Sequence, residues 1–234
     1  MRAFLVRVGI DQAFGGWNAP IDPSTGAFVY VPIPEKAGTP FQPGLEKSYE
    51  PFRNALSGFS TASQCLLPGE LSGLHPHLDP DFDQLTYGDN GLRRGKGLCD
   101  LGIGDLVVFF AGMRPTSPCE HRLVYVLIGL YRVGEVVRLR DIPAERWAEN
   151  AHTRKLKQGP DDVIIRAQSG VSGRLEHALP IGEFRDKAYR VRRDLLAAWG
   201  GLSCVTASSS GVRYRQPSKI RRGSWLGSRH SRPV

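Results

Sequence analysis

The sequence predicts an α+β fold, in which a curved antiparallel sheet or a small barrel has its helices packed outside. Several short runs of β-branched and aromatic residues are separated by connections rich in glycine and proline. The two strongest runs, 104–113 and 122–139, follow each other directly, as the strands of a hairpin do. Helical patterns are few, so helices and strands do not alternate as they do in an α/β fold.

The N-terminal part begins with a predicted strand at residues 3–8, followed by a loop punctuated by Gly and Pro. A second strand is predicted at 27–31, where Pro32 and Pro34 stop it because proline has no N–H to donate. Residues 49–59 (YEPFRNALSGF) predict a short helix.

The run 122–139 is too long for one straight strand, and Gly129 and Gly134 are expected where it bends or bulges. Beyond Pro143 the sequence predicts a helix at 144–156 and a strand at 161–168. The longest predicted helix covers 183–199 and ends at two glycines. Its apolar side would be formed by Phe184, Tyr189, Val191, Leu195, Leu196 and Trp199.

The chain has 234 residues, of which 41% are hydrophobic and 23% charged, values typical of a folded globular protein. We expect one α+β domain at 1–206 and a flexible basic tail at 207–234.

No apolar stretch is long enough to span a membrane, and residues 1–12 resemble a strand more than a signal peptide. The four cysteines form no CxxC pair, which argues against a zinc ribbon and fits reduced thiols in a cytoplasmic protein.

The net charge of +8 is concentrated in the tail, where seven basic residues occur without any Asp or Glu. The preceding domain is therefore close to neutral. A dense positive charge favours contact with nucleic acid phosphates. The residues expected to make this contact are Arg213, Arg215, Lys219, Arg221 and Arg222.

The segment HPHLDPDFD (75–83) is the most polar motif of the chain. Its two prolines disfavour a helix, and in an extended chain alternate side chains point the same way, so its five polar side chains could share one face. These are His75, His77, Asp79, Asp81 and Asp83. One interpretation is a solvated loop whose aspartates close turns. The other is a site that binds a divalent cation, or hydrogen-bonds a base or sugar.

Other candidates lie near the N-terminus. Asp11 follows a strand end, where it could bind a ligand or cap a turn. Gly15 and Gly16 could form a simple turn or let the backbone approach a phosphate or base. Trp17 could stack on a base or pack in the core. Arg114, beyond a strand end, could reach a phosphate or remain solvated. The sequence lacks GxSxG and the H-x-E with PCxxC of deaminases.

Four motifs in order resemble the nucleotide modification associated domain 3 family: RVGIDQAFGGWNAPI, YVPIPE, HLDPDF and GDLVVFF, within roughly residues 1–140. The matching positions are Arg7, Gly9, Asp11, Gly15, Gly16, Pro20, Ile33, Pro34, His77, Asp79, Asp81, Gly104 and Asp105. The resemblance implies a role in making modified DNA bases. The run from 104 to 137 is also similar to the central hairpin of PUA-like domains, including the EVE and ASCH types, which bind RNA or a modified base.

We therefore expect a protein that acts on a nucleotide or on a base in DNA; the alternative is a PUA-like reader that binds modified bases or nucleic acid without catalysis. Catalytic roles are assigned to Asp11, Asp79 and Asp81. Nucleotide binding is assigned to Arg7, Gly15, Gly16, Trp17, His77 and Arg114. The sequence predicts no particular cofactor, metal or oligomeric state.

Overall fold

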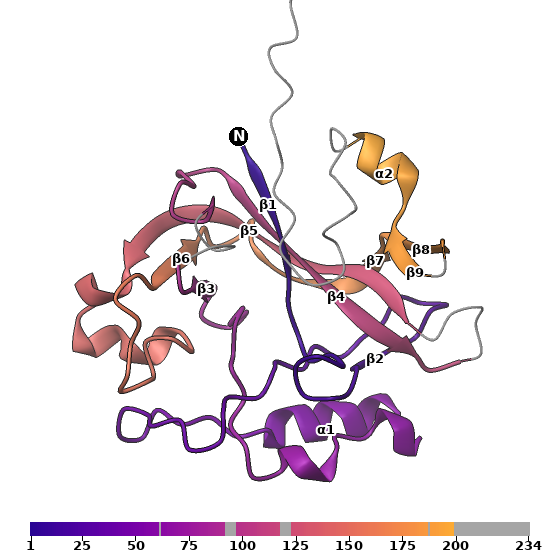
Figure 1. Cartoon of the computed structure of the whole chain (residues 1–234), viewed down its shortest axis with the longest axis horizontal. Helices are drawn as coiled ribbons and strands as arrows, with labels where there is room; N and C mark the ends of the chain where they lie inside the picture. Colours follow the sequence, from indigo (N-terminus) through magenta and orange to yellow (C-terminus); the bar gives the residue numbers. More distant parts are fainter. Residues whose placement is uncertain (61, 92–96, 118–122, 187, 199–234) are drawn as a thin grey trace, which may run out of the picture.

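Two long antiparallel strands, β4 (Leu106–Pro115) and β5 (Val124–Arg138), form the centre of the fold (Figure 1). The computed structural model describes residues 1–60, 62–91, 97–117, 123–186 and 188–198. The expected basic tail at 207–234, with its Arg and Lys residues, lies outside the described residues.

Shorter strands extend both edges of this central pair. On the side away from β5, β4 pairs in parallel with β1 (Ala3–Arg7) and β2 (Pro20–Ile21). The other edge of β5 pairs with β6 (Val163–Ala167) and β7 (Gly173–Pro180), and β6 pairs in turn with β3 (Thr86–Asp89).

The seven-stranded sheet has a main order of β1-β4-β5-β6-β3 and is open. The α+β class is compatible with this architecture, but the expected alternative of a small PUA-like barrel is wrong. A barrel requires the two ends of the strand order to pair, and among the described residues β1 and β3 do not. The sheet is also not wholly antiparallel, because β1 and β2 run parallel to β4.

The predicted irregularities in β5 are confirmed at both glycines. The pairing register shifts between Leu127 and Gly129 on the β7 side and between Val133 and Glu135 on the β6 side. A Cβ on Gly129 would lie 2.6 Å from the Phe82 ring and 2.8 Å from the Gly173 carbonyl oxygen. Glycine is therefore needed here because side chain and backbone approach closely, as is common at β-bulges.

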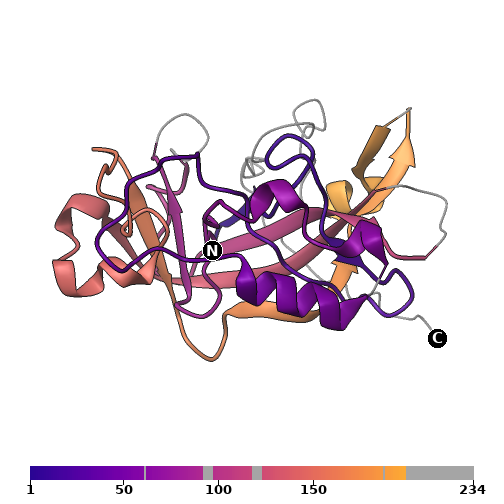
Figure 2. The same ribbon diagram turned by 90° about the horizontal axis from the view of Figure 1, so that it is seen from below.

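Apolar residues pack against both faces of the sheet, since neighbouring strand residues point to opposite sides. Phe109 belongs to the larger core, on the side covered by α1 (Glu50–Phe59), which Figure 2 shows from below. Phe110 belongs to a smaller core with Leu5 and Val191. That side carries the hairpin of β8 (Gly182–Arg185) and β9 (Ala188–Val191), and α2 (Arg193–Ala198).

The short helix predicted at 49–59 is confirmed, and 3-10 helices occupy Ser63–Cys65, Gly69–Leu71, Leu139–Asp141 and Ala144–Glu149. The strand predicted at 27–31 is wrong: Phe28 makes one isolated bridge with Ile21, and Val31 accepts a hydrogen bond from Ile10. The prolines that follow cannot extend a ladder.

The predicted helix at 144–156 is wrong, and the one predicted at 183–199 is right only at its end, where α2 covers Arg193–Ala198. Residues 144–156 form the last 3-10 helix and then turns, in which the side chains of Asn150 and Thr153 hydrogen-bond to nearby backbone. Such bonds compete with helix formation. The stretch 183–199 begins instead with the β8–β9 hairpin, whose turn includes Asp186 at φ 50°. Among the described residues, no helix has the length and apolar character needed to cross a bilayer.

Candidate functional site

The polar segment 75–83 is extended, as predicted, and its first residues pair with the segment 33–35. The Glu35 N–H donates to the His75 carbonyl, and the His77 N–H donates to the Ile33 carbonyl, each at 2.8 Å. This pairing brings two side chains together: Nδ1 of His77 lies 2.6 Å from Oε1 of Glu35. The Lys155 ammonium contacts the same carboxylate oxygen at 2.9 Å.

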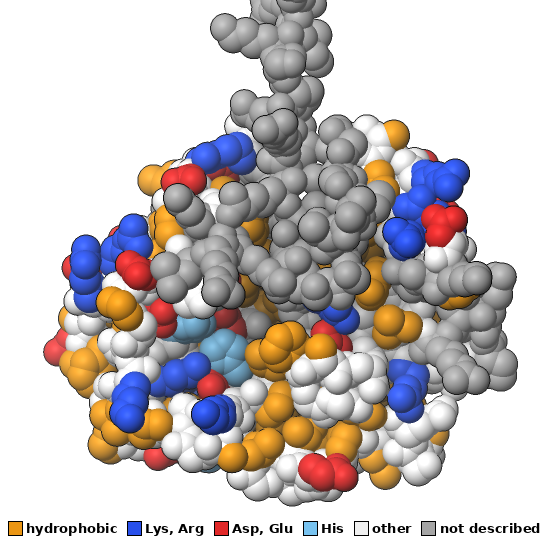
Figure 3. Space-filling view, in the orientation of Figure 1, with side chains coloured by type: hydrophobic (Ala, Val, Ile, Leu, Met, Phe, Trp, Pro, Cys, Tyr) orange, Lys and Arg blue, Asp and Glu red, His pale blue; other side chains and the backbone are white. Residues whose placement is uncertain are grey.

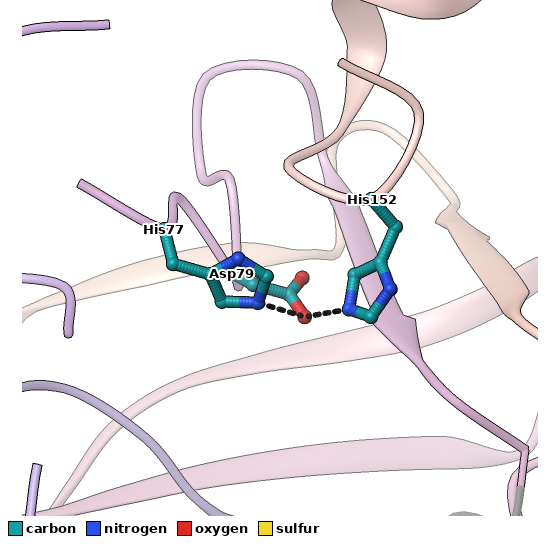
Figure 4. Close-up of side chains that lie close together, drawn as sticks. All are labelled: His77, Asp79 and His152. Carbon is teal, nitrogen blue, oxygen red and sulfur yellow. Dashed lines mark ion pairs between the residues drawn. The ribbon is translucent and has the colours of Figure 1, made fainter. Parts of the chain in front are cut away.

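Asp79 lies at the centre of the cluster formed by His77, Asp79 and His152 (Figure 4). Its Oδ1 accepts hydrogen bonds from the Gly88 N–H at 2.7 Å and the Asn150 side-chain amide at 3.1 Å. Its Oδ2 lies between the two imidazoles, 3.8 Å from Nε2 of His77 and 3.6 Å from Nε2 of His152. One carboxylate oxygen is thus held by the scaffold while the other faces both histidines.

His152 reaches the cluster from the turn that follows the Ala144–Glu149 helix. The Asn150 side-chain oxygen accepts a hydrogen bond from the His152 backbone N–H at 2.9 Å. The ring is oriented by Asp162, whose Oδ2 lies 2.9 Å from Nδ1 of His152. Gly88 packs behind the ring, where a Cβ would lie 2.6 Å from Cδ2 of His152 and 2.7 Å from the Asn150 oxygen.

The cluster is largely buried but not sealed from solvent. The Asp79 side chain is 5% exposed, whereas the imidazoles of His77 and His152 are 14% and 13% exposed. Figure 3 shows histidine side chains at the surface beside acidic ones, with lysine and arginine side chains nearby. Both imidazoles could therefore contact a molecule arriving from solution, with the carboxylate beneath them.

The two histidines differ in protonation. Burial lowers the pKa of His77, and the charge of His152 adds to this effect, although Glu35 opposes it. Burial alone would also lower the pKa of His152, but the carboxylates of Asp162 and Asp79 raise that pKa to about 9. At neutral pH the cluster thus pairs a neutral imidazole with a charged one, an arrangement suited to proton transfer or to exchange of the proton for a cation.

Further ionisable groups surround the cluster. Burial raises the pKa of Asp89, and the Asp79 charge raises it further. Burial and the Asp79 charge also raise the pKa of the Tyr30 phenol. Among the described residues the Tyr30 hydroxyl has no hydrogen-bond partner. A buried hydroxyl without a partner is uncommon and costs free energy.

Asp81, the neighbouring predicted catalytic residue, has different partners. Its Oδ2 accepts a hydrogen bond from Nη2 of Arg154 at 2.6 Å, in a pair whose side chains are 6% and 3% exposed. Its Oδ1 accepts from the backbone N–H groups of Asp83 and Gln84. Arg154 also donates to the Ala148 carbonyl, so this ion pair ties the segment that carries His152 to the segment that carries Asp79.

Asp11 lies in a second charged region, and its hydrogen bonds and ion pair involve no residue of the cluster. Its carboxylate pairs with Nη2 of Arg7 at 2.9 Å and accepts hydrogen bonds from the Ala13 and Phe14 N–H groups. Gly15 and Gly16 adopt φ values of 101° and 69° in the same turn, a conformation that favours glycine. The structure therefore brings Arg7, Asp11 and the two glycines together around a turn.

The remaining predicted residues are dispersed. The Trp17 ring is buried in the larger core, with its N–H donating to the Gln64 carbonyl at 3.2 Å. Arg114 lies near the end of β4 and donates its backbone N–H to the Ala19 carbonyl. His75 contacts the Lys47 carbonyl, and Asp83 is exposed. The nucleotide-binding roles assigned to these regions stay predictions.

Sequence reasoning missed Glu35, His152 and Asp162, which complete the cluster. Glu35 directly follows the Ile-Pro of the family pattern, and that position was the available signal for it. His152 lies in the segment predicted as a helix and Asp162 at the start of a predicted strand, without a spacing that links either to residue 79. Only the folded chain brings these three segments together.

Comparison with known proteins gives one match. The family model of nucleotide modification associated domain 3 matches residues 2–206, a longer span than the motifs in the sequence indicate. Searches of curated proteins and of solved structures returned no match. This family match includes the cluster around Asp79 and covers most of the chain. The chain therefore belongs to the nucleotide modification associated domain 3 family.

Proposed function

We propose that this protein catalyses a step in the modification of a nucleotide or of a base in DNA, with His77, Asp79 and His152 as its reactive centre. Family membership supports the association with nucleotide modification. The observation that supports a reaction is the cluster itself, in which two histidines with opposite pKa shifts flank a buried carboxylate. Groups with shifted pKa values that are held together at one partly accessible place are typical of active sites.

The test is mass spectrometry of nucleosides, from both DNA and the free nucleotide pool, in cells that express the wild-type chain or Asp79→Asn. We expect a new or missing nucleoside with the wild type and an unchanged pool with the variant. Asp83→Asn is the matched control, because Asp83 is exposed in the same segment and lies outside the cluster. An unchanged nucleoside pool in every strain, together with selective binding of a modified base, would instead support the non-catalytic reader.

Contact with DNA through the tail is a separate part of the proposal. Seven positive charges without a negative one should bind phosphates and release counterions, so affinity should fall steeply with salt. Removing residues 207–234 should flatten this salt dependence, measured by fluorescence anisotropy with duplex DNA, and leave the thermal unfolding of the domain unchanged. Identical salt slopes with and without the tail would refute this role of Arg213, Arg215, Lys219, Arg221 and Arg222.

A further inference from the structure

Two imidazole nitrogens and one carboxylate oxygen in the cluster are farther apart than hydrogen-bonded atoms. The Nε2 atoms of His77 and His152 lie 3.8 and 3.6 Å from Oδ2 of Asp79, and all three atoms fall within 4.8 Å of one another. In an N–H···O hydrogen bond the nitrogen and oxygen atoms are usually about 2.7–3.2 Å apart, so both distances to Asp79 are longer than a normal hydrogen bond. Two ligands that each bind a zinc ion at about 2.1 Å in tetrahedral geometry are roughly 3.4 Å apart.

We propose that His77, Asp79 and His152 bind a divalent first-row transition-metal ion through two nitrogen atoms and one oxygen atom. A contraction of a few tenths of an ångström would bring Oδ2 of Asp79 and each Nε2 to this spacing, and the two histidine nitrogens already lie within 4.8 Å of each other. Figure 4 shows the carboxylate between the two rings, so the donors converge from two separate segments of the chain.

The outer nitrogen of each ring supports this assignment. Nδ1 of His77 lies 2.6 Å from Glu35, and Nδ1 of His152 lies 2.9 Å from Asp162. An ionised carboxylate only accepts hydrogen bonds, so each Nδ1 carries the hydrogen, and Nε2 of the neutral ring turns its lone pair toward Asp79. Metal-binding histidines almost always donate their other ring N–H in this way, which fixes the ring and increases its basicity.

The third ligand is equally well oriented. The Gly88 N–H and the Asn150 amide both donate to Oδ1 of Asp79, at 2.7 and 3.1 Å. Oδ2 remains directed at the two imidazoles. A metal ion would replace the proton on Nε2 of His152, after which two nitrogen lone pairs and the carboxylate oxygen would face one shared cation.

The local charge is also that of a cation site. Glu35, Asp79 and Asp162 are each at most 10% exposed, and Lys155 contacts only the first of them as an ammonium partner. The three buried carboxylates therefore outnumber their cationic partners among the described residues, even when His152 is counted beside Lys155. A divalent ion would offset this excess, since buried charges need a counter-charge.

The donor types select the class of ion. Imidazole suits zinc, iron and copper, whereas magnesium and calcium prefer oxygen ligands alone. Two histidines and one carboxylate leave coordination positions open on the solvent side of the rings, as catalytic metal sites do. The role of the ion in a reaction rests on the proposed function, whereas its binding does not.

The experiment uses the untagged full chain, freed of metal with a chelator and titrated with Co²⁺ while visible absorption is recorded. We expect one Co²⁺ per chain, displaced by one equivalent of Zn²⁺ and not by millimolar Mg²⁺. His77→Gln, His152→Gln and Asp79→Asn should weaken binding by at least roughly 100-fold, and Glu35→Gln or Asp162→Asn by roughly 10–100-fold. His75→Gln and Asp83→Asn, from the same segment but outside the cluster, should bind as the wild type does.

A measurement on the wild type alone covers the case in which a variant fails to fold. With ¹⁵N-labelled histidine, Zn²⁺ should shift the Nε2 resonances of two of the six histidines. Absence of stoichiometric binding, equal displacement by Mg²⁺, or tight binding by His152→Gln would overturn the metal site. Metal binding without any change in cellular nucleosides would refute the proposed function and leave the metal site intact.

Discussion

Asp79 and Asp81 lie two residues apart on one extended segment and are almost equally buried, with side chains 5% and 6% exposed. Their partners differ in kind. Asp81 faces the guanidinium of Arg154, a permanent cation that neutralises it, whereas one oxygen of Asp79 faces two imidazoles whose charge depends on conditions. The comparison indicates that two equally buried carboxylates can differ in their counter-charge, and we expect this difference to distinguish a structural role for Asp81 from the proposed reactive role of Asp79.

Asp11 extends the comparison, because it resembles Asp81 more than Asp79. It too pairs with an arginine and accepts hydrogen bonds from the N–H groups of its own turn. Asp11 and Asp81, two of the three carboxylates expected to be catalytic, thus each pair with an arginine and accept hydrogen bonds from a turn. Such contacts orient the backbone. Substitutions that remove charge without changing shape should therefore affect stability and activity in different proportions at the three positions.

The largest loss of stability is expected for Asp81→Asn. This change leaves the Arg154 guanidinium, 3% exposed, without its ionic partner. Removing one member of a buried ion pair typically costs about 3–5 kcal/mol of unfolding free energy. Urea unfolding measures the effect, and a loss below about 1 kcal/mol would contradict the structural role.

A smaller loss is expected for Gly88→Ala, which alters the support of Asp79 without changing any charge. The new Cβ would meet His152, Asn150 and Ile164 at 2.6, 2.7 and 3.0 Å. Overpacking of this kind costs about 1–3 kcal/mol, and displacement of His152 should also abolish nucleoside modification. Gly58→Ala is the control, because no atom lies within 4 Å of its would-be Cβ in α1 and alanine favours helices. Full activity of Gly88→Ala would show that the position of His152 is not critical.

Local pattern and residue type were enough to predict parts of the fold. The strong apolar runs identified β4 and β5, and the two glycines in the longer run identified its bulges. The pattern failed where side chains compete with the backbone, as Asn150 and Thr153 do in the predicted helix at 144–156. It also failed in the first part of 183–199, where the chain turns at Asp186 and Val191 packs in the smaller core.

Prediction of the site was limited in the same way. Alternation across two prolines correctly brought His77 and Asp79 to one place, since both belong to a single extended segment. It could not distinguish Asp79 from Asp81, because the distinction depends on Arg154 and His152, more than 70 residues away in sequence. Long-range partners of this kind are not encoded in local spacing.

A loss of about 1 kcal/mol is expected for Asp11→Asn. Its partner Arg7 is 22% exposed, so water can solvate the guanidinium after the charge is removed, unlike Arg154. The asparagine oxygen can still accept the hydrogen bonds from Ala13 and Phe14. The unfolding free energies of Asp11→Asn and Asp81→Asn, measured together, should differ by at least about 2 kcal/mol. A stable but inactive Asp11→Asn protein would support the catalytic role that the sequence predicts for this residue.

The smallest change in stability, with the largest loss of activity, is expected for Asp79→Asn. The amide keeps the shape of the carboxylate, and its oxygen can still accept the hydrogen bonds from Gly88 and Asn150. No arginine is left unpaired, and removal of one negative charge relieves repulsion with Asp89, whose pKa Asp79 raises. Stability should therefore stay within about 1 kcal/mol of the wild type. Nucleoside modification should nevertheless cease, because the atom that faces both imidazoles has lost its charge. If Asp79→Asn unfolds as readily as Asp81→Asn, or remains as active as Asp83→Asn, then the two buried aspartates do not differ as their partners indicate.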